Sequence, residues 1–309
     1  MPRTVALELR DIRAVYGRVT VLHGVTLAVH RGEILGLLGP NGSGKSTTLG
    51  IAAGVIDPVA GSVSIDGIDR TRDPHRFAIR VGFVPQDSAI YEELTAVQNL
   101  EFFGRLYGLR GYDLDSRIAK ALARSRLTDR SHEPAGTFSG GLRRRLGIAI
   151  ALLPDPPVLL LDEPTAALDA ASRDDLFADL HRLREEGHAV MLTTHHAEEA
   201  EQVCDRIAML ETGRLVAEGP PSELMRPQSS GRCVLFGHLD GSLPKFLERR
   251  IRRRLDADIG FEVTGHRVRL SAWTADELGR ALALVLAEGA HLDRYRSVSG
   301  RLEPTAKAA

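Results

Sequence analysis

The chain has 309 residues, of which 43% are hydrophobic and 26% charged, and a formal net charge of -1 at pH 7. This length is sufficient for two domains with buried cores, and the composition is ordinary for a globular protein. Because proteins built mainly to bind nucleic acid are strongly basic, we expect no nucleic-acid partner for this nearly neutral chain.

Two further features limit the class of protein. Cys204 and Cys233 are isolated, without the paired spacing of a structural zinc site. No apolar run reaches the roughly 18–20 residues that span a bilayer, and the N-terminal residues do not read as a signal peptide. We therefore expect any role at a membrane to depend on a partner protein.

The first segment with a regular pattern, residues 5–29, alternates apolar and polar side chains. This alternation predicts short antiparallel strands with one solvent-exposed face. Tyr16 falls at a turn between these strands. An aromatic side chain near a nucleotide-binding loop can stack on a base, although a tyrosine in a turn often has only a structural role.

Residues 33–47 carry the strongest functional signal. Residues 33–38 are almost wholly apolar and predict a buried strand, and residues 46–54 predict a helix that ends at a glycine. The loop between them matches the phosphate-loop pattern G-x-x-x-x-G-K-[ST] without a mismatch. Converging backbone N–H groups and a helix N-terminus bind phosphate there. The predicted nucleotide-binding residues are Gly39, Pro40, Asn41, Gly42, Ser43, Gly44, Lys45, Ser46 and Thr47.

The phosphate-loop pattern also predicts individual roles. Lys45 is expected to reach the β- and γ-phosphates, and the Ser46 hydroxyl to ligate Mg²⁺. A second buried strand, predicted at residues 79–84, leads to Gln86. Ligands bind at the carboxyl ends of strands in open α/β sheets, so Gln86 could contact Mg²⁺ or the attacking water. Simple solvation of Gln86 is the alternative.

Residues 87–153 change to helical periodicity and predict an all-helical insertion between strands of the sheet. Its third helix starts at Ser139, Gly140 and Gly141. Ser139 can cap this helix, and the two glycines would let the backbone approach a phosphate. An ordinary capped helix start explains the same residues, so this motif is ambiguous by itself.

Two carboxylates follow the apolar strand predicted at residues 158–161. Asp162 is placed to hold a metal ion, and Glu163 to orient or deprotonate a water that faces the γ-phosphate. The next predicted strand, residues 189–194, ends at His195. We expect His195 to leave the same edge of the sheet as Lys45, Gln86 and Asp162.

The last third of the chain has a different organisation. Residues 225–231 are rich in proline and serine and predict a linker. Beyond it, strand and helix patterns follow in the order β-α-β-β-α-β, which predicts a small α+β, ferredoxin-like domain. We thus expect a nucleotide-binding domain at 1–228 and an accessory domain at 229–309, with a disordered tail from residue 303.

These motifs, in this order, resemble the nucleotide-binding subunit of an ABC transporter over about residues 4–224. The resemblance implies a P-loop NTPase (RecA-like) α/β core with an antiparallel β subdomain and a helical insertion. It also implies a role for each motif. Tyr16 would stack on adenine, residues 39–47 would form Walker A, and Gln86 would lie in the Q-loop. Phe138 to Leu142 would form the signature, Asp162 and Glu163 would belong to Walker B, Asp169 to the D-loop, and His195 would be the switch histidine.

The signature motif departs from the family pattern Leu-Ser-Gly-Gly-Gln at its ends, where Phe138 and Leu142 stand. The centre, Ser139 to Gly141, is intact, so we expect its contact with the γ-phosphate to be retained. Leu142 makes this edge of the expected site less polar.

The resemblance also implies an activity and partners. The family hydrolyses ATP with Mg²⁺ between two cassettes that pair head to tail, so we expect a homodimer or a paired cassette. A separate ABC-2-type permease would hold the chain at the cytoplasmic face of the plasma membrane. Residues 90–109 resemble exporter cassettes of the drug-resistance and ABC-2 type, which favours export. The alternative is a soluble ABC-type ATPase that acts on ribosomes or DNA without a permease.

Overall fold

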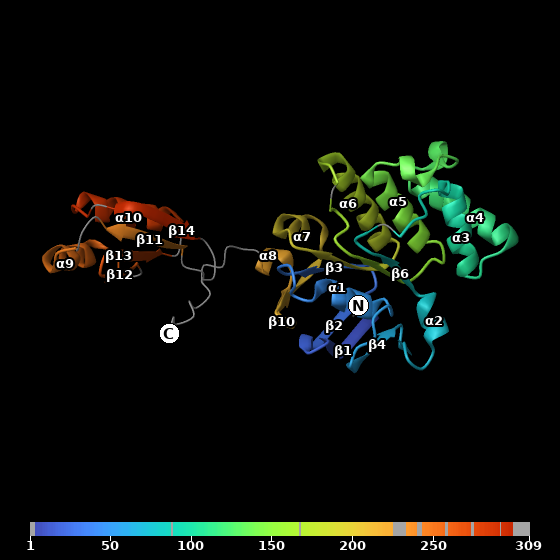
Figure 1. The fold of residues 1–309 in the computed structure, drawn as a ribbon, viewed down its shortest axis with the longest axis horizontal. Coiled ribbons are helices and arrows are strands. Elements are labelled where there is room, and N and C mark those ends of the chain that lie inside the picture. The colour runs from blue at the N-terminus through green and yellow to red at the C-terminus, as the bar shows by residue number, and fades with distance from the viewer. Residues whose placement is uncertain are drawn as a thin grey trace. The chain divides into compact units, whose positions relative to one another are not determined.

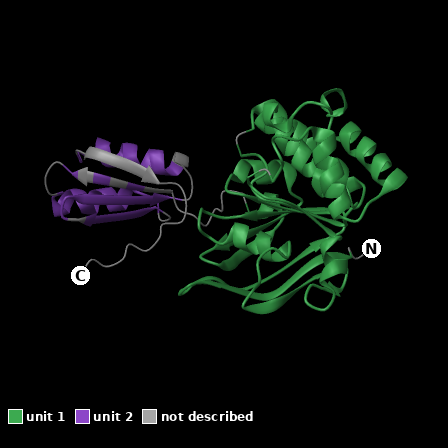
Figure 2. Ribbon diagram, turned by 45° about the vertical axis from the view of Figure 1, so that its right-hand side comes forward, with its two compact units in different colours: residues 1–224 green, residues 225–309 purple. Residues whose placement is uncertain are grey.

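The computed structural model describes residues 4–87, 89–166, 168–224, 233–239, 243–256, 259–272, 275–290 and 292–298. The chain divides into two compact units, residues 1–224 and 225–309, which Figure 2 distinguishes by colour. The expected linker at 225–231 and the expected disordered tail from residue 303 lie outside the described residues.

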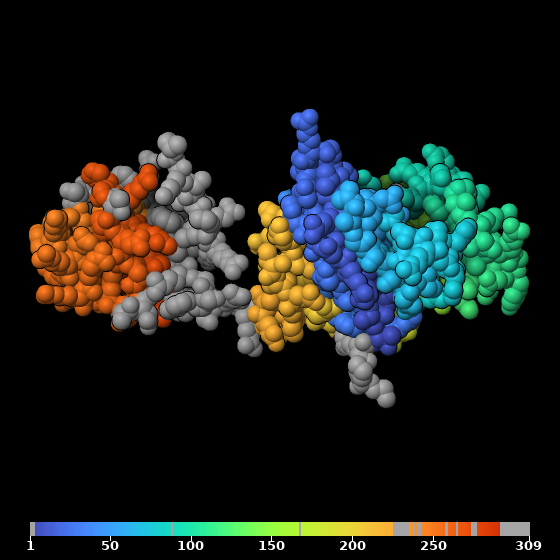
Figure 3. All heavy atoms as spheres, turned by 90° about the horizontal axis from the view of Figure 1, so that it is seen from below, coloured from blue at the N-terminus to red at the C-terminus, as the bar shows by residue number. Residues whose placement is uncertain are grey.

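The N-terminal part of the first unit is an antiparallel sheet with the strand order β2-β1-β4-β5. The strands are β1 (Val5–Tyr16), β2 (Val19–His30), β4 (Ala60–Ile65) and β5 (Ile68–Asp69). Alternate side chains such as Leu7 and Leu9 are buried, as the sequence pattern predicts. β1 and β2 are longer than expected, because several register shifts let them follow one another through a bend. Figure 3 shows these strands in blue on the surface of the unit.

The second sheet has six strands in the order β10-β9-β3-β8-β7-β6. Its strands are β3 (Glu33–Leu38), β6 (Val81–Val84), β7 (Val158–Leu161), β8 (Ala189–Thr194), β9 (Arg206–Glu211) and β10 (Arg214–Gly219). All pairs are parallel except β9 with β10. β3, β7 and β8 are buried along their whole length, which explains their continuous apolar sequences.

One strand boundary differs from the prediction. The strand expected at residues 79–84 starts at Val81, because α2 (Pro74–Ala78) runs up to it and Ile79 closes that helix. Asp73 caps α2 by accepting a hydrogen bond from the Arg76 N–H, and a proline occupies its first position. These are strong helix-start signals, and they shorten the strand.

Helices cover both faces of the six-stranded sheet (Figure 1). α1 (Lys45–Ala52) lies between this sheet and the antiparallel sheet, within one continuous apolar core. α5 (Gly140–Ala151), α6 (Ala170–Glu185) and α7 (Ala197–Val203) lie on the opposite face. α8 (Pro221–Leu224) ends the unit.

The helical insertion is present, with α3 (Ala96–Leu106) and α4 (Gly111–Arg124) packed against α5. Its core is a second apolar cluster that includes Leu100, Leu114, Leu122 and Leu146. α3 begins with a capping box, in which Thr95 and Gln98 each bind the other's backbone N–H. The 3.6-residue spacing of apolar side chains therefore identified these helices correctly.

The second unit contains the elements in the order β-α-β-β-α-β. They are β11 (Cys233–Leu239), α9 (Lys245–Arg254), β12 (Gly260–Thr264), β13 (Arg267–Ala272), α10 (Ala275–Ala287) and β14 (Leu292–Val298). The strands pair antiparallel in the order β12-β13-β11-β14. Ile251 and Val285 from the helices join Leu235, Phe261 and Leu270 from the strands in a third apolar core.

Across the part of the chain that the structure describes, no helix combines the length and the apolar character needed to cross a bilayer.

One buried amide organises the entry into the helical insertion. Asn99 on α3 is fully buried, and its side-chain oxygen accepts a hydrogen bond from the Tyr91 N–H at 2.8 Å. Its side-chain nitrogen donates to the carbonyl groups of Tyr91, Leu94 and Thr95 at 2.9–3.2 Å. Since this segment has little regular structure of its own, the amide supplies its backbone partners.

We expect Asn99→Ala to lower the free energy of unfolding by about 2–3 kcal/mol, because several buried backbone groups lose their partner. Urea unfolding measures this difference. Gln202→Ala, at an exposed position of α7, is the control and should change stability by less than about 0.5 kcal/mol. Equal stability of the two variants would contradict this account of Asn99.

Candidate active site

The phosphate loop connects β3 to α1 and requires glycine at two positions. A Cβ on Gly39 would lie 2.2 Å from the Leu210 carbonyl oxygen. Gly44 has φ 103°, and a Cβ there would lie 2.7 Å from the Leu22 side chain. Both contacts are shorter than any real Cβ contact, so the loop can approach β2 and β9 only with glycine.

Lys45 is the first residue of α1 and is almost fully buried. Its Nζ donates to the carbonyl oxygens of Gly39 at 2.9 Å and Pro40 at 3.2 Å. These bonds hold the ammonium group over its own loop, and one of its three protons is left for a further acceptor. In the described chain, the buried Ser43 Oγ has no hydrogen-bond partner. A buried donor without a partner fits a site for an oxygen-rich ligand such as phosphate.

Two oxygen ligands of the type that Mg²⁺ prefers lie beside the loop. The Ser46 hydroxyl donates to Asp162 Oδ1 at 3.3 Å, although the two residues are 116 positions apart in the chain. Asp162 follows β7 and is buried. A hydroxyl and a carboxylate oxygen in this arrangement fit a divalent cation, so the donor set is suited to Mg²⁺. Gln86 follows β6, the neighbour of β7, but its side chain is exposed and no described contact joins it to this pair.

Thr193 connects the two carboxylate residues. Its hydroxyl donates to Asp162 Oδ1 at 2.5 Å and accepts a hydrogen bond from the Glu163 N–H at 2.8 Å. Thr193 is fully buried in β8, so both bonds are shielded from water. The sequence does not predict a role for Thr193, because it lies in a strand that is otherwise mostly apolar. A hydroxyl at the end of such a strand is the signal that could have revealed it.

Glu163 has an uncommon backbone conformation, with φ 41°. A glutamate gains nothing locally from this left-handed conformation, so the surrounding bonds must impose it. The result is a largely buried carboxylate whose Oε1 lies 3.2 Å from His195 Nδ1. His195 is about 40% exposed, so this pair lies where the site opens to solvent.

The two consecutive histidines have different surroundings. His195 contacts the Glu163 carboxylate, whereas the His196 N–H donates to the Thr194 hydroxyl at the start of α7. Glu199 accepts hydrogen bonds from Thr194 and from Thr165. The end of β8 is thus fixed to the segment that follows Glu163, which gives His195 a defined position.

The Ser139 turn lies on a different part of the surface. Ser139 caps α5, its Oγ accepting from the Leu142 N–H at 3.4 Å, and Ser139 and Gly140 are exposed. A Cβ on Gly141 would lie 2.9 Å from Ser172 Oγ at the start of α6. No hydrogen bond or ion pair among the described residues joins this turn to the phosphate loop. One chain therefore brings together Lys45, Ser46, Asp162, Glu163 and His195, but not the serine and glycines of the turn.

Phe138 and Leu142, which stand at the two ends of the Phe138 to Leu142 motif, pack into the helical insertion. Phe138 is 3% exposed within the apolar cluster of α3, α4 and α5, and the partly buried Leu142 packs against the same cluster. Their apolar character is therefore explained by packing. Tyr16, the last residue of β1, is 51% exposed and has no described side-chain contact with the loop.

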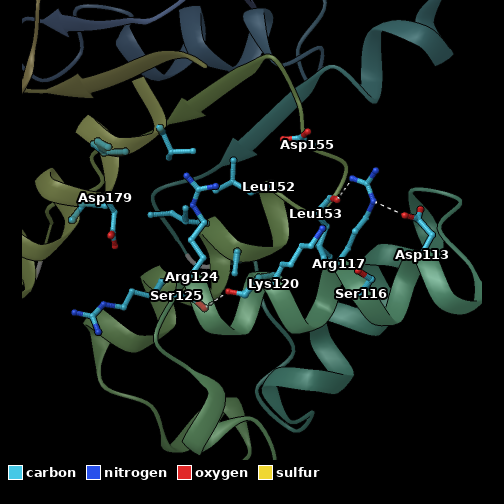
Figure 4. A pocket seen from close by; sticks show the side chains of 17 residues that line it. Asp113, Ser116, Arg117, Lys120, Arg124, Ser125, Leu152, Leu153, Asp155 and Asp179 are labelled. Carbon is cyan, nitrogen blue, oxygen red and sulfur yellow. Dashed lines mark hydrogen bonds and ion pairs between the residues drawn. The ribbon is translucent and has the colours of Figure 1, made fainter. Parts of the chain in front are cut away.

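A cavity of about 320 Å³ lies apart from these residues, between α4, α5 and α6 (Figure 4). Its inner wall is apolar, with Ile148, Leu152 and Leu180, and Arg117, Lys120 and Arg124 from α4 lie along it. None of the predicted site residues lines this cavity, so it is not part of the candidate active site.

Comparisons with known proteins agree with this geometry. A family model described as "ABC transporter" matches residues 22–166. "Nod factor export ATP-binding protein I" of Cupriavidus pinatubonensis is 39% identical over 251 residues, covering 80% of this chain and 77% of that protein. "Linearmycin resistance ATP-binding protein LnrL" of Bacillus subtilis is 37% identical over 218 residues, covering 71% and 70%. A dimeric ATP-binding cassette, solved in a post-hydrolysis state with ADP and Pi, superposes with a TM-score of 0.63 at 29% identity, covering 70% of this chain and 98% of that one.

We expect Thr193→Val to lower the free energy of unfolding by about 1–3 kcal/mol, because the Glu163 N–H and the Asp162 carboxylate lose a buried partner while the volume is conserved. Chemical denaturation measures the loss. Thr20→Val, at an exposed position of β2, makes the same chemical change in a control site and should be nearly neutral. A Thr193 variant as stable as that control would show that the hydroxyl bridge contributes nothing.

Proposed function

The chain belongs to the ABC transporter family of ATP-binding proteins, and from this premise we propose that residues 1–228 form a nucleotide-binding domain whose active site is completed by a second copy. It is an exporter-type ABC ATPase. The relatives named for Nod factor export and for linearmycin resistance support its place among exporters. An ABC ATPase that acts on ribosomes or DNA is not favoured by these relatives.

The single observation that carries the paired-site proposal is the separation of the Ser139 turn from the phosphate loop within one chain. Residues 39–47, Asp162 and Glu163 gather at one sheet edge, whereas the Ser139 turn is exposed at the start of α5. A two-fold pairing would place the turn of each chain on the nucleotide held by the other. The related cassette that binds ADP and Pi is itself a dimer, which supports this arrangement.

In this proposal the phosphate loop and Lys45 bind the β- and γ-phosphates of ATP. Ser46 and Asp162, with Gln86 joining them, would hold Mg²⁺, which neutralises phosphate charge when bound. Glu163 accepts a proton from the water that attacks the γ-phosphorus, and the bond to the β-phosphate oxygen breaks to release ADP. His195, 3.2 Å from Glu163, orients the carboxylate. Ser139, Gly140 and Gly141 of the partner stabilise the γ-phosphate, and Tyr16 stacks on the adenine.

We propose two partners for this ATPase. A second copy of the chain gives the homodimer, and a separate ABC-2-type permease holds it at the cytoplasmic face of the plasma membrane. The relatives named for export and resistance are described as ATP-binding proteins, which supports a separate membrane partner. For residues 229–309 we propose a ferredoxin-like accessory domain, supported by the β-α-β-β-α-β order and the strand order β12-β13-β11-β14.

Glu163→Gln should keep MgATP affinity but lower the hydrolysis rate by about 10²–10⁴-fold, because an amide cannot accept the proton from water. Nucleotide binding and single-turnover hydrolysis measure the two effects separately. With ATP present, the variant should accumulate as a dimer in size-exclusion chromatography. A rate equal to that of the unaltered protein would exclude Glu163 as the general base.

Paired sites can be tested by mixing two inactive variants. Lys45→Ala should prevent ATP binding, and Ser139→Arg should block the turn that meets the partner's nucleotide. In a mixture, half of the dimers combine the variants, and each of these has one of its two sites intact, so activity should recover to at most about a quarter of the original. Mixing Lys45→Ala with the double variant Lys45→Ala, Ser139→Arg is the matched control, since no intact site forms. Full activity of Ser139→Arg alone would contradict the paired site.

A further inference from the structure

One arginine of the candidate site region is buried without a carboxylate partner. Arg144 on α5 is 5% exposed, and no ion pair of the described residues includes it. Burial lowers the pKa of Arg144, an effect that the negative charges of Asp162 and Asp87 oppose. A charged group is rarely buried without a partner of opposite charge, so its hydrogen bonds must account for its position.

The hydrogen bonds of Arg144 all go to main-chain carbonyl groups. Its guanidinium donates to the carbonyl oxygens of Pro85 at 2.8 Å and Gln86 at 3.0 Å. A longer bond of 3.4 Å reaches the carbonyl oxygen of Glu163. The planar fork of an arginine can serve several acceptors at once, whereas the ammonium of a lysine is a single point. Arg144 therefore joins the segment after β6 to the segment after β7.

The neighbouring arginines behave differently. Arg143 pairs with Glu92 at 3.0 Å, and Arg145 pairs with Asp175 at 2.5 Å. Both are half-buried, and both contact carboxylates near the surface. Successive residues of a helix point about 100° apart, so α5 directs only the middle arginine toward the sheet edge.

Two of the three acceptors of Arg144 belong to residues with proposed catalytic roles, and the third is Pro85. Arg144 contacts Gln86 and Glu163 only through their carbonyl groups, so it does not occupy their side chains, and the Glu163 carboxylate remains beside His195. Glu163 also has the left-handed backbone conformation that only surrounding bonds can maintain. Ser139, at the start of the same helix, is the residue proposed to meet the partner's nucleotide.

We propose that Arg144 is a positioning residue that fixes Gln86 and Glu163 to the helix carrying the Ser139 turn of the same chain. This inference rests on the proposed function. In a two-fold dimer, the turn of a chain acts at one nucleotide, and Gln86 and Glu163 of that chain act at the other. Arg144 thus connects the part of a chain that acts at one nucleotide to the part that acts at the other. It holds the base, Glu163, in a fixed position relative to the helix that carries the Ser139 turn.

The test compares Arg144→Lys and Arg144→Met with a matched control. Arg70→Met removes another largely buried arginine, which donates to the Ile56 carbonyl at 3.0 Å and also pairs with Asp57; no described hydrogen bond or ion pair joins it to the site residues. We expect both Arg144 variants to bind MgATP within about threefold of the original affinity and to lose at least about tenfold in kcat, because the phosphate loop, Ser46 and Asp162 remain while Gln86 and Glu163 are displaced. Arg70→Met should change neither quantity.

The mixing experiment separates positioning from general structural support. When Ser139→Arg chains are mixed with Lys45→Ala chains, the intact site takes its Glu163 from the Ser139→Arg chain. Adding Arg144→Lys to that chain should lower the recovered rate about tenfold, whereas adding it to the Lys45→Ala chain should lower the rate less than about twofold. An equal loss from both placements would show a structural effect and overturn the proposal.

Other outcomes also decide whether Arg144 is a positioning residue. Unchanged kcat in Arg144→Lys would show that charge alone suffices, which contradicts the forked contact. Parallel loss of ATP affinity and thermal stability would reduce Arg144 to a folding role. If Arg144→Met does not fold, Arg144→Lys decides, because it keeps the charge and most of the side-chain volume. Failure of the original mixture to recover activity would instead contradict the paired site, and so distinguishes the two proposals.

Discussion

The structure depends on the parallel pairing of β3, β8, β7 and β6, since this pairing determines where four separate chain segments end. Leu38 pairs with Thr194, Leu161 with Leu192, and Val84 with Leu161. Polar residues that follow these positions therefore emerge at one edge, although the strands lie far apart in the sequence. Hydrogen bonds between β-strands thus bring Ser46 near Asp162, and Glu163 near His195.

Polar groups buried at this edge are kept in place by hydrogen bonds rather than by ion pairs. Lys45 bonds to carbonyl groups of its own loop, and Arg144 bonds to carbonyl groups of two others. Thr193 holds the Asp162 carboxylate and the Glu163 N–H. Because none of these cations is neutralised by a directly bonded carboxylate, the site keeps positive charge available for a polyanionic substrate.

Predictions from the sequence were most successful where one short segment contains both an element of the fold and the site residues that follow it. The phosphate-loop pattern, the apolar strand before Asp162 and the strand before His195 predicted both the elements and their shared edge, because local glycine requirements and strand burial leave clear signals. These predictions missed Thr193 and Arg144, whose partners are determined only by tertiary packing. They also started the strand before Gln86 too early, because the apolar character of Ile79 concealed the end of α2. The exposed side chain of Gln86 shows that reaching the correct edge does not by itself bring a residue into contact with Ser46 and Asp162.

The residues of the pentapeptide from Phe138 to Leu142 have two different kinds of surroundings. Ser139 and Gly140 are at the surface, where they can contact a ligand, while Phe138 is enclosed among the helices of the insertion. Side-chain volume therefore limits which residue can stand at position 138, because the surrounding core of the insertion must accommodate it. The identity of residue 138 in this chain is thus explained by packing of the insertion, without any contact with nucleotide.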